Sequence, residues 1–135
     1  MSASEELDCR AINHEDPMHG RVLQIVLCHT VVPAHWDHER AVIAGEVGRN
    51  DPQILILDLR RIEFVYGVAL IGALVAGYLS MQKLGSNRRT RVVASGQVAE
   101  KLPDMLRICK LDSLLGSKLY SDPETALLAQ DGASL

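Results

Sequence analysis

The chain has 135 residues, 47% of them hydrophobic, and a formal net charge of -3. This length suits one compact core and is too short for two domains of ordinary size. No run of Lys and Arg exceeds two residues, as at Arg88-Arg89, so the sequence offers no basic patch for nucleic acid or for an anionic membrane. We therefore expect one domain whose partners include neither.

The amino-terminal residues, Met1 to Leu7, are acidic and polar. They lack the basic start and apolar centre of a signal peptide, which predicts a cytoplasmic protein. Three cysteines, Cys9, Cys28 and Cys109, stand far apart in the sequence. An odd number at such spacing favours reduced thiols packed in the interior over a disulfide framework.

The first part of the chain predicts a β-hairpin followed by a helix. Residues 7–13 and Arg21 to Cys28 are expected to be strands, joined by a polar turn over residues 14–20. Pro33 suits the first turn of a helix that runs to about Gly48. The residues Asn50-Asp51-Pro52 then end this helix.

The central part predicts a buried strand followed by a long apolar helix. Residues 54–59 form an apolar run broken only by Asp58, which is typical of a strand covered on both faces. Asp58 therefore needs a partner, and Arg60, Arg61 or a loop amide can supply it. Residues 68–84 then predict a helix whose small residues, such as Gly77, permit close packing on the sheet. This helix is too short and too polar in places to span a membrane.

The remaining elements complete an α/β pattern. Residues 89–95 predict a strand, and residues 98–109 predict a helix with Cys109 facing inward, in which Pro103 indicates either two short pieces or a start at the proline. A short strand around Tyr120 and a capped helix from Ser121 onward follow. Strands that alternate with helices indicate a mixed, largely parallel sheet of four or five strands with helices packed on it.

The order of these elements, and several local patterns, resemble a STAS domain, the fold of bacterial anti-sigma factor antagonists. The resemblance covers about residues 8 to 130, which leaves a flexible N-terminus at residues 1–7 and a C-terminal tail at residues 131–135. It rests on Ile54-Leu55-Ile56-Leu57-Asp58-Leu59, on the helix of small residues that ends at Lys83-Leu84-Gly85, and on the closing segment of residues 120–126.

In phosphorylatable members of that family, the loop before the long helix reads Asp-Ser-Ser-Gly-Leu, and its second serine is the target of a partner kinase. The matching positions here are Tyr66, Gly67, Val68, Ala69 and Leu70. Gly67 and Val68 carry no hydroxyl group, so the resemblance implies a binding module without phosphorylation at the usual position. A tyrosine-bearing apolar surface at a helix start suits constitutive contact with a protein.

The resemblance thus implies a non-enzymatic interaction module without a cofactor, and we expect its partner-binding surface to comprise Val65, Tyr66, Gly67, Val68, Ala69 and Leu70. The expected partner is an anti-sigma factor, a kinase-like regulator or a sensory assembly, and a homodimer is a further possibility. Two alternatives stay open: a sensor that binds a small ligand or a nucleotide at the carboxyl edge of the sheet, and an accessory subunit of a lipid transporter.

The sequence predicts no binding or catalytic role for the remaining histidine, cysteine and arginine clusters. The histidines His29, His35 and His38 with Cys28 do not complete an obvious set of metal ligands, so we expect solvated histidines and no metal site. The basic residues of the segment 88–91 are expected to form a solvated edge.

Overall fold

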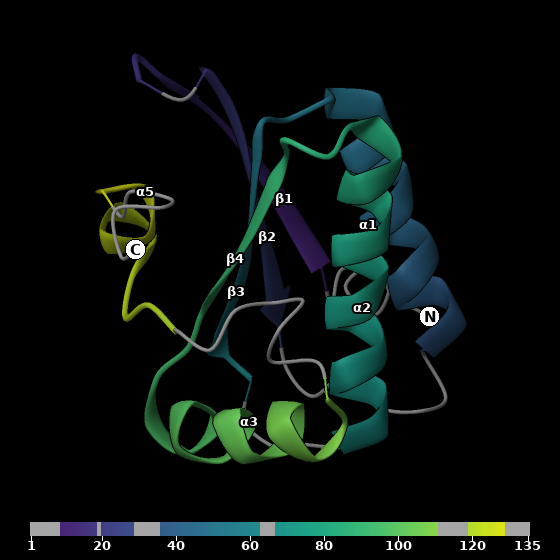
Figure 1. Ribbon diagram of the computed structural model, residues 1–135, viewed down its shortest axis with the longest axis vertical. Coiled ribbons are helices and arrows are strands. Elements are labelled where there is room, and N and C mark those ends of the chain that lie inside the picture. The colour runs from purple at the N-terminus through teal and green to yellow at the C-terminus, as the bar shows by residue number, and fades with distance from the viewer. Residues whose placement is uncertain (1–8, 19, 29–35, 63–66, 111–118, 129–135) are drawn as a thin grey trace, which may run out of the picture.

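The structure is a computed structural model that describes residues 9–18, 20–28, 36–62, 67–110 and 119–128. Strands and helices alternate along most of the chain (Figure 1). In chain order they are β1 (Cys9–Asp16), β2 (Gly20–Cys28), α1 (Trp36–Asn50), β3 (Ile54–Arg61), α2 (Gly67–Leu84), β4 (Arg89–Val93), α3 (Gly96–Ile108) and α5 (Pro123–Leu128). The α/β prediction is confirmed.

One mixed sheet of four strands, in the order β1-β2-β3-β4, forms the centre of the molecule. The hairpin strands β1 and β2 are antiparallel, whereas β2 pairs with β3, and β3 with β4, in parallel. Tyr120 adds an isolated parallel bridge to Val93 at the outer side of β4. The prediction of a mixed, largely parallel sheet of four or five strands is confirmed.

The two faces of the sheet are covered unequally. Helices α1 and α2 lie on one face, α5 lies on the other, and α3 crosses the end of the sheet (Figure 1). Alternate residues of β3 face each side, so Leu55 and Leu57 join the larger core while Ile54 and Ile56 join the smaller core under α5. Burial on both faces explains why the sequence of β3 does not alternate between apolar and polar residues.

Helix α2 packs very closely on β3. A Cβ atom placed on Gly77 would lie 3.0 Å from Cδ1 of Leu57 and 3.1 Å from Cδ2 of Leu55. Since glycine lacks this atom, the helix axis can approach the strand at this point. The predicted role of Gly77 is confirmed.

Helix α3 differs from its prediction in two respects. It runs without a break from Gly96 to Ile108 and contains Pro103. The side chain of Pro103 is exposed, so its ring points to solvent and the missing N–H affects a single turn. Cys109 follows the helix and is exposed, so the prediction of an inward-facing thiol there was wrong.

Smaller differences between prediction and structure concern the ends of strands and helices. Strand β1 continues to Asp16, three residues beyond its predicted end, which shortens the hairpin turn. Pro33 lies outside the described residues, and the helix α1 is described from Trp36 to Asn50.

In the described part of the chain, no helix combines the length and apolar character needed to cross a membrane.

Candidate protein-interaction site

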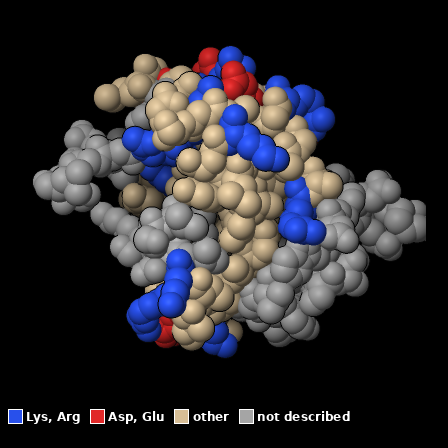
Figure 2. Space-filling view, turned by 45° about the vertical axis from the view of Figure 1, so that its right-hand side comes forward, with Lys and Arg blue, Asp and Glu red and all other residues tan. Residues whose placement is uncertain are grey.

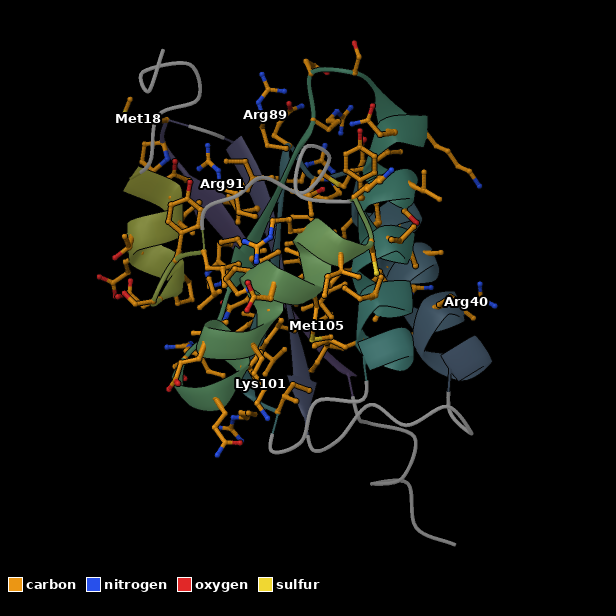
Figure 3. All side chains as sticks on the ribbon, turned by 60° about the horizontal axis from the view of Figure 1, so that its bottom comes forward. Met18, Arg40, Arg89, Arg91, Lys101 and Met105 are labelled. Carbon is orange, nitrogen blue, oxygen red and sulfur yellow. The ribbon has the colours of Figure 1, made fainter. Side chains whose placement is uncertain are left out.

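The candidate site lies where the parallel strands end and the next helices begin. Strand β3 ends at Arg61 and β4 at Val93, and α2 and α3 start at Gly67 and Gly96. Gly96 has φ +61°, a conformation that glycine tolerates and that allows β4 to turn directly into α3. Figure 3 looks toward this end, where α3, with Lys101 and Met105, crosses in front of the sheet. We call this end the carboxyl edge of the sheet.

The predicted site residues fall at this edge as far as the structure describes them. Val65 and Tyr66 lie outside the described residues. Gly67 is the first residue of α2, and the backbone of the next two residues belongs to its first turn. Leu70 is 1% exposed and belongs to the larger core. Leu70 therefore anchors the first turn of α2 to the body of the domain.

Asp58 and Arg60 form a fixed ion pair beside this edge. Asp58 is 1% exposed, and its Oδ1 accepts hydrogen bonds from the backbone N and the Nε of Arg60, both at 3.0 Å. A terminal guanidinium nitrogen of Arg60 donates to Oδ2 at 2.8 Å. The side chain of Arg60 remains 40% exposed. The expectation that Asp58 holds a nearby arginine is confirmed, and the pair fixes the end of β3.

The surroundings of Asp58 favour its charged form. Burial by itself raises the pKa of this carboxyl, but the hydrogen bonds and positive charge of Arg60, with a further hydrogen bond from Gln24, outweigh that effect. The net result is a pKa below the usual value of 3.8. The same pairing raises the pKa of Arg60. Asp58 is therefore an ionised structural group at neutral pH.

Two residues of the hairpin extend this polar network across the sheet. Gln24 is 6% exposed, and its Nε2 donates to Oδ2 of Asp58 at 2.9 Å. The remaining Gln24 oxygen lies 2.9 Å from Nε2 of His14. Because an amide oxygen can only accept, Nε2 of His14 carries the proton in this arrangement. These contacts were not predicted from the sequence, since Gln24 and His14 precede Asp58 by 34 or more positions along the chain.

Helix α2 brings an uncharged surface to the site. Its single charged residue is Lys83, in the last turn. In Figure 2 a strip without Lys, Arg, Asp or Glu runs down the face of the molecule, with Lys and Arg at its margins. At the carboxyl edge, Arg60 and Arg61 are exposed. An uncharged centre with charged residues at its margin is the usual composition of a protein interface.

The arginines at the start of β4 are less solvated than predicted. Arg91 is 4% exposed and donates to the backbone oxygen of Ala126 in α5. The Arg88 side chain is 14% exposed and binds Oδ1 of Asp51 at 2.7 Å. The prediction of a solvated edge was therefore wrong for both, because each side chain has a partner distant in the sequence.

The start of α5 agrees with its sequence pattern. Oδ1 of Asp122 accepts a hydrogen bond from the backbone N of Thr125 at 2.7 Å, which is the geometry of a helix N-cap. This bond lowers the pKa of Asp122.

The expectation of solvated histidines falls on side chains that lie outside the described part of the structure. His29 and His35 lie outside the described residues, and the side chains of Cys28 and His38 are not described either. Within the described ranges, no group of three or more His, Cys, Asp or Glu residues is arranged to hold a metal ion.

Comparison with known proteins identifies similar folds only at the level of structure. No protein-family model and no curated protein matches the sequence. The crystal structure of an anti-sigma factor antagonist from Mycobacterium paratuberculosis matches with a TM-score of 0.62 and 22% sequence identity, covering 90% of this chain and 93% of that one. The anti-sigma factor antagonist SpoIIAA in its unphosphorylated form also gives a TM-score of 0.62, at 12% identity, covering 87% of this chain and 93% of the other.

These matches extend over nearly the whole of both chains, so they concern the complete arrangement of strands and helices. Sequence identities of 22% and 12% are low, which limits the conclusion to architecture. The resemblance seen in the sequence is confirmed at that level: the chain has the STAS fold of anti-sigma factor antagonists.

Proposed function

We propose that this chain is a non-enzymatic regulatory module that binds a protein partner through the start of α2. The partner is an anti-sigma factor, a kinase-like regulator or a larger sensory assembly. The proposal is carried by one observation: in a fold shared with anti-sigma factor antagonists, α2 begins at the carboxyl edge with Gly67-Val68-Ala69. As a regulator of this kind, the protein acts in the cytoplasm.

The composition of this first turn supports constitutive binding. Gly67 and Val68 have no hydroxyl group, so neither residue can carry a phosphoryl group. The first turn of α2 also contains no acidic residue. The proposed contact therefore persists without phosphorylation at these positions. Together with Val65 and Tyr66, these residues provide apolar and aromatic contact area, which commonly dominates binding energy in interfaces.

The described elements that flank the proposed surface are held in place. Leu70, the last residue of the predicted site, fixes the first turn of α2 in the core. On the other side of the edge, the pair of Asp58 and Arg60 holds the end of β3. Fixed flanking elements lower the conformational entropy that is lost when a partner binds.

Affinity capture from a native lysate, followed by identification of the bound proteins, tests this function. We expect Tyr66→Ala and Val68→Asp to lower the amount of captured partner at least about tenfold, a loss of about 1.4 kcal/mol. The matched control is Leu79→Ala. Leu79 is also apolar and 52% exposed on α2, but it lies about 16 Å farther along the helix from Val68.

Three outcomes contradict the proposal. Equal capture by wild type, Tyr66→Ala and Val68→Asp places the contact elsewhere. A parallel loss of capture and of melting temperature assigns these residues to folding. A nucleotide or lipid that co-purifies with the chain, without a protein partner, favours one of the two alternatives predicted from the sequence.

A further inference from the structure

Among the described residues, β1 is an end strand of the sheet. In the described sheet its single neighbour is β2, and all eight residues from Cys9 to Asp16 pair with it in continuous register, without a bulge. The side chains of residues 11–15 are exposed. A long, regular end strand presents a row of backbone N–H and C=O groups that can pair with another strand.

At the opposite edge of the sheet, a described residue already pairs with the end of β4. At β4, the backbone N of Tyr120 donates to the oxygen of Val92, and the N of Ala94 donates to the oxygen of Tyr120, both at 3.0 Å. Strand β1 also lacks proline and lysine, two residues that commonly prevent pairing at sheet edges.

We propose that β1 pairs with β1 of a second copy of this chain, in antiparallel orientation, about a twofold axis at Asn13. The two sheets then form one continuous sheet of twice the number of strands. This interface lies at a strand edge, away from the start of α2, and the proposal does not rest on the proposed function.

The order of charges along β1 favours an antiparallel second copy over a parallel one. A basic residue, Arg10, stands near the start of the strand, and Glu15 and Asp16 stand at its end. An antiparallel copy in this register places Arg10 opposite Asp16 of the second copy, twice in each dimer. A parallel copy would place like charges side by side, which is unfavourable.

The same register also covers an exposed apolar side chain. Ile12 is 36% exposed, and the axis at Asn13 places it opposite His14 of the second copy. Ile12 and His14 lie on one face of the strand, since their positions differ by two. A twofold axis perpendicular to the sheet preserves this alignment of faces, as a closed and symmetric dimer requires.

Analytical ultracentrifugation of the full chain, at concentrations up to about 1 mM, tests the dimer directly. We expect a monomer–dimer equilibrium. Arg10→Asp or Asp16→Arg alone should raise the dissociation constant about tenfold. Each change places two side chains of the same charge opposite each other, and this happens twice in each dimer. The double variant Arg10→Asp/Asp16→Arg should return it close to the wild-type value. A chain that stays monomeric throughout, or a double variant no better than the single ones, overturns the proposal.

Crosslinking provides a second test that is independent of charge. In a Cys109→Ser background, Asn13→Cys places two thiols opposite each other at the axis, with Cα atoms about 5 Å apart. We expect a short bismaleimide to crosslink this variant at least about tenfold faster than Ala41→Cys in the same background. Ala41 is an exposed residue of α1. Equal rates for the two variants, or no crosslinking beyond that of Cys109→Ser, would refute β1 pairing.

Discussion

At Asp58, burial and charge conflict. A carboxylate that is 1% exposed loses its hydration, and the loss is tolerated because Arg60 and Gln24 donate four hydrogen bonds to it. An ion pair with a buried carboxylate adds little net stability compared with apolar residues of the same volume, but removing one partner is costly. Its effect is to fix the geometry at the end of β3.

Replacement of Asp58 should therefore destabilise the protein in a pH-dependent manner. We expect Asp58→Asn to lower the free energy of unfolding by about 2 kcal/mol at pH 7. Because the folded-state pKa of Asp58 lies below 3.8, its contribution is complete above that pH and is lost as the pH falls through the folded pKa. Urea unfolding at pH 7, 5 and 3 should show the gap between wild type and variant narrowing at the lowest pH.

A surface carboxylate supplies the control for this experiment. Asp104 pairs with Arg107 on α3, and both side chains are more than 60% exposed. Asp104→Asn should change the free energy of unfolding by less than about 0.5 kcal/mol. A gap for Asp58→Asn that is equally small, or that stays constant down to pH 3, would show that the buried pair does not act as described.

At the scale of elements, the packing of α2 on β3 depends on the absence of a side chain at Gly77. Valine there would bring its Cβ to about 3 Å from two leucine methyl groups of β3. The helix or the buried leucine side chains must then shift, and we expect Gly77→Val to cost about 2–3 kcal/mol in the free energy of unfolding. Chemical denaturation measures this change.

Gly45 is the matched control because it also lies in a helix, but an added side chain there would contact no other residue. No atom lies within 4 Å of a Cβ built on Gly45, in the middle of α1. Gly45→Ala should therefore stabilise the protein, by up to about 1 kcal/mol, since alanine has the higher helix propensity. If Gly77→Val were as stable as wild type, the close approach of α2 to β3 would be incorrect.

The elements that the sequence predicted well are those whose signal is local. The apolar run of β3, the apolar helix α2 and the capped start of α5 each depend on neighbouring residues. Each was predicted close to its observed bounds. Burial of Arg91 was not predictable in this way, because its partner, the carbonyl of Ala126, is 35 positions away. The continuous helix through Pro103 depends on its exposure, which periodicity alone does not establish.

The same reasoning applies to the candidate site. The sequence predicted a helix from Val68, one residue after the observed start of α2 at Gly67, and predicted that Arg60, Arg61 or a loop amide holds Asp58. Both predictions follow from short segments. It could not predict that Gln24 and His14 continue the network, because strand register between distant segments decides those contacts. The partner-binding role of residues 65 to 70 stays a prediction.

At the scale of the whole molecule, the two proposed contact surfaces lie on different parts of the sheet. The docking surface is at the carboxyl edge beside β3, whereas the dimer forms along β1, which is separated from β3 by β2. An antiparallel dimer directs the carboxyl edges of its two copies in opposite directions. Two partner molecules can then bind one dimer without competing for space.

This separation predicts a complex with equal numbers of both proteins. With the captured partner in hand, the Asn13→Cys/Cys109→Ser dimer, once crosslinked, should bind two partner molecules, and light scattering coupled to gel filtration measures that stoichiometry. Val68→Asp should abolish partner binding without changing the dimer, and Arg10→Asp should weaken the dimer without changing partner affinity, because the surfaces share no residue. One partner per crosslinked dimer would mean that the two surfaces overlap or that the partner spans both copies.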